Sequence, residues 1–122
     1  MPKSPIPILY VHLNDLITMV YFNAKNMPEF ARDVIGINLA KITNKMLEKY
    51  LEYTNGLIDK ETAMKSIIKG TTYLKNQMKI IQTLHLISNA KICRLLETVV
   101  TIERLSRKYY NIEIQRRQNA KK

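Results

Sequence analysis

The chain has 122 residues, enough for one domain with its own hydrophobic core. Hydrophobic residues make up 46% of it and charged residues 25%, which excludes a disordered polymer, and its single cysteine excludes an intrachain disulfide or a thiolate metal cluster. A net charge of +10, from 20 lysines and arginines against 10 acidic residues, predicts attraction to polyanions such as RNA, DNA, an acidic protein face or an anionic membrane.

Three prolines in residues 1–7 predict an irregular lead-in, because proline lacks the N–H group that a helix interior needs. A first helix is expected over about residues 8–24, since apolar residues recur there at helical spacing. Its apolar stripe consists of Leu9, Leu13, Leu16 and Val20. Polar residues interrupt this segment, so it is too short and too polar to span a bilayer. The N-terminus also lacks the apolar run of a signal peptide, and we expect a cytoplasmic protein with no membrane partner.

A second helix is expected to begin near Asn26 and to run to about Tyr53. Asn26 and Glu29 have the spacing of a capping box, and Pro28 falls in the first turn, where its missing N–H does no harm. The apolar stripe of this helix consists of Ile35, Leu39, Ile42, Met46, Tyr50 and Tyr53. Residues 54–56, Thr-Asn-Gly, predict its end, because asparagine and glycine tolerate the left-handed backbone conformation.

Two more helices are expected, each with a side-chain cap. Asp59 predicts the cap of a third helix that reaches about Ile87, and Ser88 predicts the cap of a fourth helix that continues past Tyr109. The third helix has a stripe at Ile67, Thr71, Leu74, Met78, Ile81 and His85, and a second row at Tyr73, Ile80, Leu84 and Ile87 that is expected to widen its apolar face. The stripe of the fourth helix consists of Ile92, Leu95, Leu96, Val99, Ile102 and Leu105.

Short connections between amphipathic helices force consecutive helices to run antiparallel. The predicted fold is therefore all-α, an antiparallel up-down-up-down four-helix bundle. The bundle occupies residues 8–114, between the lead-in at residues 1–7 and a basic flexible tail at residues 115–122. Neither strand alternation nor an internal repeat is present in the sequence.

Residue patterns for catalysis are missing from the sequence. His12 and His85 are the only histidines, and they belong to different expected helices. There is no Glu-x-x-His pair of a di-iron bundle, no P-loop and no dinucleotide-binding motif. Cys93 lies among apolar residues, and we expect a buried, inert thiol. We therefore predict a protein that is not an enzyme and carries no metal or cofactor. A cofactor-binding bundle enzyme is an alternative that the scarcity of ligand residues disfavours.

Positive charge follows the polar faces of the second, third and fourth expected helices and continues into the tail, and on the third helix it comes from Lys65, Lys69 and Lys79. Arginine binds phosphate through a bidentate fork, whereas lysine acts mainly as a point charge. Tyr109 and Tyr110 lie among the basic residues, and tyrosine rings stack on unpaired bases. The candidate nucleic-acid-binding residues are Lys41, Lys45, Lys91, Arg94, Arg104, Arg107, Lys108, Arg116 and Arg117. An acidic protein partner and a plain solvated surface stay open as alternatives.

Residues 27–42, MPEFARDVIGINLAKI, place a glycine inside an expected helix, at a cost of about 1 kcal/mol relative to alanine. Gly36 and Ala40 lie one turn apart and form a flat patch that a neighbouring backbone can approach closely. Arg32, one turn earlier, is placed to reach a carboxylate or carbonyl there. We assign Pro28, Arg32, Gly36 and Ala40 to an oligomer or helix-packing contact. The alternative is that Gly36 only relieves a clash inside the core.

Pro28, Arg32 and Gly36 follow one another at steps of four, and a serine cap at Ser88 opens the last helix. In these residues, and in the order and length of its helices, the segment 8–110 resembles a four-helix-bundle family. That family includes the accessory variability determinant of diversity-generating retroelements and small proteins encoded in intervening sequences of bacterial ribosomal RNA genes.

The first branch of this family implies a non-catalytic accessory subunit that forms a pentameric barrel. Such a subunit binds the retroelement reverse transcriptase and its template RNA or RNA/cDNA, and supports mutagenic copying. The second branch implies a structural or general nucleic-acid-binding protein without a reverse-transcriptase partner. Five chains at +10 would carry a total of about +50, so binding to a polyphosphate is expected to fall steeply with salt.

Overall fold

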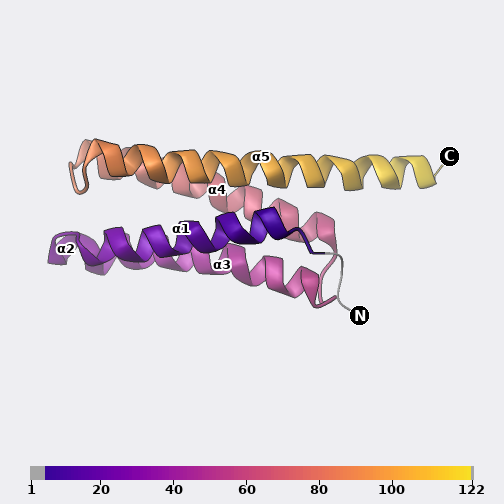
Figure 1. Ribbon diagram of the computed structural model, residues 1–122, viewed down its shortest axis with the longest axis horizontal. Coiled ribbons are helices and arrows are strands. Elements are labelled where there is room, and N and C mark those ends of the chain that lie inside the picture. Colours follow the sequence, from indigo (N-terminus) through magenta and orange to yellow (C-terminus); the bar gives the residue numbers. More distant parts are fainter. Residues whose placement is uncertain (1–4, 122) are drawn as a thin grey trace.

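The computed structural model describes residues 5–121, in which four long helices pack side by side into an elongated bundle (Figure 1). The elements in chain order are α1 (Pro7–Lys25), α2 (Glu29–Ala31), the π-helical segment η1 (Arg32–Gly36), α3 (Ile37–Thr54), α4 (Lys60–Thr83) and α5 (Asn89–Ala120). No strand occurs within the described range. α1 and α4 each contact α3 and α5, so the four long helices enclose one core. The prediction of an all-α helical bundle is confirmed.

The core consists mainly of the apolar stripes that helical spacing predicted. The fully buried large side chains include Leu9, Leu13, Leu16, Leu39, Met46, Ile67, Leu74, Met78, Ile81, Ile92 and Leu95. Tyr50 links α3 to the start of α1, because its ring stacks on Tyr10 with 5.7 Å between centroids. The Tyr50 hydroxyl also accepts a hydrogen bond from the Ile6 backbone N–H at 3.0 Å. Burial of these stripes is the main source of stability for helices of this kind.

The predicted caps of the last two helices are confirmed. Asp59 Oδ1 accepts a hydrogen bond from the Thr62 backbone N–H at 2.7 Å, and Ser88 Oγ accepts one from the Lys91 backbone N–H at 3.3 Å. α3 ends at Thr54, and the glycine of the following turn has a φ of 77°, as the Thr-Asn-Gly sequence predicted. These local signals therefore fix where α4 and α5 begin.

The predicted start of the second helix is wrong in its details. Asn26 does not cap it, because the Asn26 side-chain amide donates to the Phe22 carbonyl and completes the end of α1. Pro28 precedes the first helical residue of α2. The chain then forms the π-helical turn η1, in which the Ile37 N–H bonds to the Arg32 carbonyl five residues back. Such a turn holds one more residue than an α-helical turn, so the expected single helix is interrupted there.

Gly36 lies in this π-helical turn, against α1. A Cβ added at Gly36 would lie 3.0 Å from the Ala24 Cβ and 3.6 Å from its Cα. The close approach is therefore a contact within one chain, which is one of the two possibilities that the sequence left open. Ala40 is half-buried against the core. Arg32 is exposed and forms no ion pair with any residue in the range 5–121, so the expected carboxylate contact is absent there.

The predicted end of the third helix is also wrong, since α4 stops at Thr83. His85 is exposed and has a φ of 55°, so it belongs to the turn and not to the apolar stripe. Tyr73, Ile80 and Leu84 are exposed, and the second row does not widen the apolar face. The left-handed residue in the tight α4–α5 turn ends the helix before Leu84 and Ile87, whereas Tyr73 and Ile80 lie inside α4 on its solvent-facing side.

α5 continues further than the sequence indicated. Its helix extends through Ala120 and includes residues 115–120, which were expected to be flexible. Residues 1–4 of the predicted lead-in and residue 122 lie outside the described range. The expectation of a buried thiol at Cys93 is wrong, because Cys93 is exposed although Ile92 beside it is buried.

Candidate nucleic-acid interface

The nine basic residues predicted to bind nucleic acid all have exposed side chains. Three of them form ion pairs: Arg107 with Glu103 at 3.7 Å, Arg116 with Glu113 at 3.3 Å, and Arg117 with Glu61. The other six form no ion pair with any residue in the range 5–121, and they are Lys41, Lys45, Lys91, Arg94, Arg104 and Lys108. The structure thus separates cations that are already neutralised from cations that are available to a polyanion.

Lys91 and Arg94 line a pocket between α1 and α5, here called the α1–α5 pocket. Its volume is about 260 Å³ and its lining consists of Thr18, Met19, Phe22, Asn23, Lys91 and Arg94. The Phe22 ring is 59% exposed, and the Lys91 ammonium lies 5.5 Å from its centroid. The pocket therefore combines an accessible aromatic face with two cations, the combination that single-stranded nucleic acid binds in proteins.

A second pocket of about 250 Å³ lies between α3 and α4. Its lining includes Lys45 and Lys69, together with the exposed ring of Tyr73. Because α1–α5 and α3–α4 are opposite pairs in the bundle, the two pockets lie on opposite sides of the molecule. Each of the two pockets therefore contains one exposed aromatic ring and two lysine or arginine side chains.

The remaining unpaired cations have different surroundings. Lys41 lines a shallow pocket with Asp33, and Arg104 lines another with Glu97, so a carboxylate lies near each of them. Lys108 lies over the Tyr109 ring, 5.7 Å from its centroid. Local negative charge weakens the pull of Lys41 and Arg104 on a phosphate.

The aromatic residues of the interface are not the ones that the sequence indicated. Tyr109 and Tyr110 are half-buried and pack against the core, whereas the exposed rings that line the two pockets belong to Phe22 and Tyr73. A signal for Phe22 is present in the sequence, since it falls two residues beyond Val20, on the opposite side of the helix from the apolar stripe.

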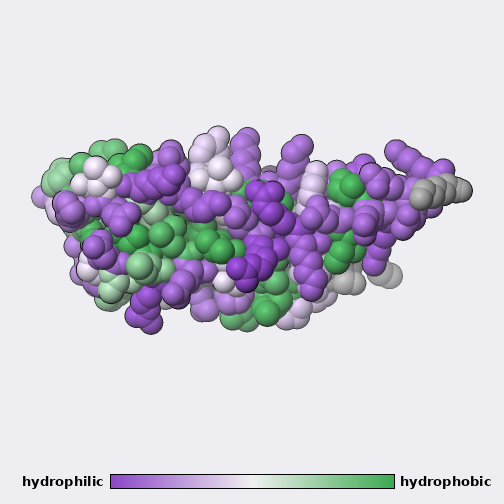
Figure 2. Space-filling model, turned by 90° about the horizontal axis from the view of Figure 1, so that it is seen from above, coloured by the Kyte–Doolittle hydropathy of each residue, from purple (hydrophilic) through white to green (hydrophobic). Residues whose placement is uncertain are grey.

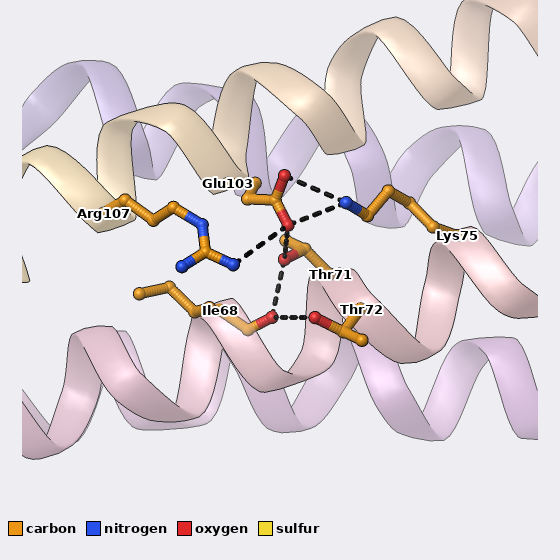
Figure 3. Close-up of polar contacts among 6 residues, drawn as sticks. All are labelled: Ile68, Thr71, Thr72, Lys75, Glu103 and Arg107. Atoms are coloured by element: carbon orange, nitrogen blue, oxygen red, sulfur yellow. Dashed lines mark hydrogen bonds and ion pairs between the residues drawn. The ribbon is translucent and has the colours of Figure 1, made fainter.

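Glu103 is the centre of a polar cluster that joins α4 to α5 (Figure 3). It accepts a hydrogen bond from Lys75 at 3.0 Å, pairs with Arg107, and accepts from the Thr71 hydroxyl at 3.4 Å. The Lys75 hydrogen bond holds the pKa of the Glu103 carboxyl below its usual value, with smaller contributions from the nearby charges. Glu103 thus neutralises charge on Lys75 and Arg107, and it forms no ion pair with the cations of the two pockets.

Within residues 5–121, no group of three or more histidine, cysteine, aspartate or glutamate side chains is arranged to hold a metal ion. Over that same part of the chain, none of the helices has the length and apolar content needed to cross a membrane. Comparison with protein-family models gave no match, and neither curated proteins nor solved structures gave one.

Proposed function

We propose that this chain is a non-catalytic helical bundle that binds the phosphate backbone of RNA. The observation that carries the proposal is the set of six exposed cations without ion pairs on a chain of net charge +10. Cations of this kind displace the counterions that surround a polyphosphate, and this release drives binding. Backbone contacts position the nucleic acid without reading its sequence.

The resemblance to accessory variability determinants makes the proposal more specific. The chain would act in the cytoplasm as an accessory subunit of a diversity-generating retroelement, binding the reverse transcriptase and template RNA or RNA/cDNA. We further propose an antiparallel up-down-up-down order and assembly into a homopentamer. The α4–α5 turn and α2 lie at one end of the molecule and the α3–α4 connection lies at the other, which supports that order (Figure 1).

Apolar residues gather toward the end of the molecule that holds the α4–α5 turn (Figure 2). The exposed apolar side chains of α2, η1 and this turn are Phe30, Val34 and Leu84. Exposed apolar groups that lie together mark protein contacts, so they support a partner subunit or protein at this end.

Purification of this chain in complex with a reverse transcriptase would distinguish the two branches of the family. The retroelement role requires this partner, and a ribosomal intervening-sequence protein does not have it.

The test of RNA binding is the salt dependence of affinity for a fluorescent single-stranded RNA, measured by anisotropy. We expect the double variant Lys91→Gln/Arg94→Gln to reduce the magnitude of the log–log slope by about 1.4, which is about 0.7 for each lost phosphate contact. The matched control is Arg116→Gln/Arg117→Gln, which removes the same charge from arginines already paired with Glu113 and Glu61. We expect this control variant to change the log–log slope by less than the Lys91→Gln/Arg94→Gln variant does.

Two results would contradict the proposal. Wild-type protein that binds RNA without salt dependence, or not at all, would exclude a backbone contact. Equal slope changes in the two double variants would show that pairing with a carboxylate does not decide which cations bind RNA. The six cations without ion pairs would then no longer support the proposal.

A further inference from the structure

We propose that the α1–α5 pocket takes one unpaired base of a bound RNA strand. The base would stack on Phe22, and an adjoining phosphate would contact Lys91 or Arg94. This inference rests on the proposed RNA binding. It deepens that function, because backbone binding alone needs no contact to a base.

Phe22 supplies the first observation. Its ring is 59% exposed and forms part of the pocket lining, and the Lys91 ammonium lies 5.5 Å from the ring centroid. An exposed aromatic face beside a cation is the kind of surface on which unpaired bases stack.

The size and shape of the pocket supply the second observation. A volume of about 260 Å³ lies just below the range of about 300–1,000 Å³ that is typical of small-molecule sites, which suits one ring system better than a large cofactor. The Phe22 ring forms part of the lining and is more than half exposed. A flat ring that enters from solvent can therefore stack on it.

Lys91 lies over the Phe22 ring and would have to yield this position to the base. A cation–π contact at an exposed site contributes about 2- to 5-fold in affinity, whereas stacking of a base on an aromatic side chain contributes about 5- to 150-fold. Stacking therefore displaces the Lys91 ammonium from the ring, and the lysine is then free to contact a phosphate.

The chemistry of the lining favours a nucleotide over an acidic peptide. Lys91 and Arg94 lie about one turn apart on α5, and neither forms an ion pair within residues 5–121. Acidic side chains would satisfy these cations, but an aspartate or glutamate side chain has no ring that could stack on Phe22. A nucleotide carries an anion and a flat ring in one unit.

The experiment compares a single-stranded RNA with the duplex that it forms with its complement, at one fixed salt concentration. Wild-type protein is expected to bind the single strand more tightly, because paired bases cannot enter the pocket. Phe22→Ala is expected to weaken single-strand binding by about 5- to 150-fold and to leave duplex binding unchanged. The control is Leu57→Ala, which removes another apolar side chain that is 74% exposed and lies outside the pocket lining.

The outcomes distinguish this inference from the proposed function. Equal, salt-dependent binding of single strand and duplex, unchanged by Phe22→Ala, would overturn the base pocket and leave backbone binding intact. Failure of the wild-type protein to bind either RNA would overturn both proposals. Binding of polyglutamate without binding of RNA would do the same and would point to an acidic protein partner.

Discussion

Replacing Gly70 with alanine tests how closely α3 and α4 pack beside the second pocket. Gly70 is buried in α4, and a Cβ added there would lie 2.5 Å from the Met46 Cγ and 2.6 Å from its Sδ. Met46 is only 1% exposed, but it lines the second pocket together with Gly70, so relief of this contact requires its side chain to turn toward that pocket. Alanine gains about 1 kcal/mol over glycine in a helix interior, but overpacking a core costs about 1–3 kcal/mol. We therefore expect Gly70→Ala to lose up to about 2 kcal/mol of unfolding free energy.

The assay is urea unfolding, followed by circular dichroism, of a double-mutant cycle with Met46→Ala. Met46→Ala alone is expected to cost about 2–5 kcal/mol, because it leaves a cavity. It also removes the atoms that a methyl group at position 70 would meet. In this background Gly70→Ala should stabilise the protein by about 1 kcal/mol, through helix propensity. The same substitution thus changes sign between the two backgrounds, and an equal effect in both would refute the reasoning.

Two more predictions concern an ion pair and the assembly. Glu103→Gln should cost about 1 kcal/mol at pH 7. Because folding lowers the pKa of Glu103, this stabilisation is present above the unfolded pKa and disappears as pH falls through the folded value. Wild type and variant should therefore converge in acid, and a gap in unfolding free energy that is the same at pH 3 and pH 7 would contradict this. Native mass spectrometry of nucleic-acid-free protein should give the mass of five chains, whereas a monomer or dimer would remove the pentamer from the proposal.

The helical bundle could be predicted because its signals are local. Apolar spacing of three and four residues defines the stripes, and Asp59 and Ser88 are side chains that cap helices wherever the chain context allows. The π-helical turn could not be predicted in this way. Gly36 lies in this turn and packs closely against Ala24 on another helix, and that contact exists only after the helices pack.

The candidate interface was predictable in its charge but not in its arrangement. The basic positions are evident from the sequence, yet Arg117 is neutralised by Glu61, a residue more than 50 positions away. That pairing depends on the register of α5 against α4, which periodicity does not determine. Phe22 was missed for a similar reason, since the exposure of its ring is a property of the packed molecule.

The far end of α5 extends beyond the other helices (Figure 1). α5 has 32 residues and α4 has 24, which at 1.5 Å per residue correspond to lengths of about 48 Å and about 36 Å. Charged contacts link this end to the start of α4: Lys60 with Glu113 at 3.7 Å, and Arg117 with Glu61. Dissolved ions screen such contacts and leave apolar packing in place. Higher ionic strength is therefore expected to weaken the contacts that hold this end of α5, as it weakens the binding of the exposed cations to a polyphosphate.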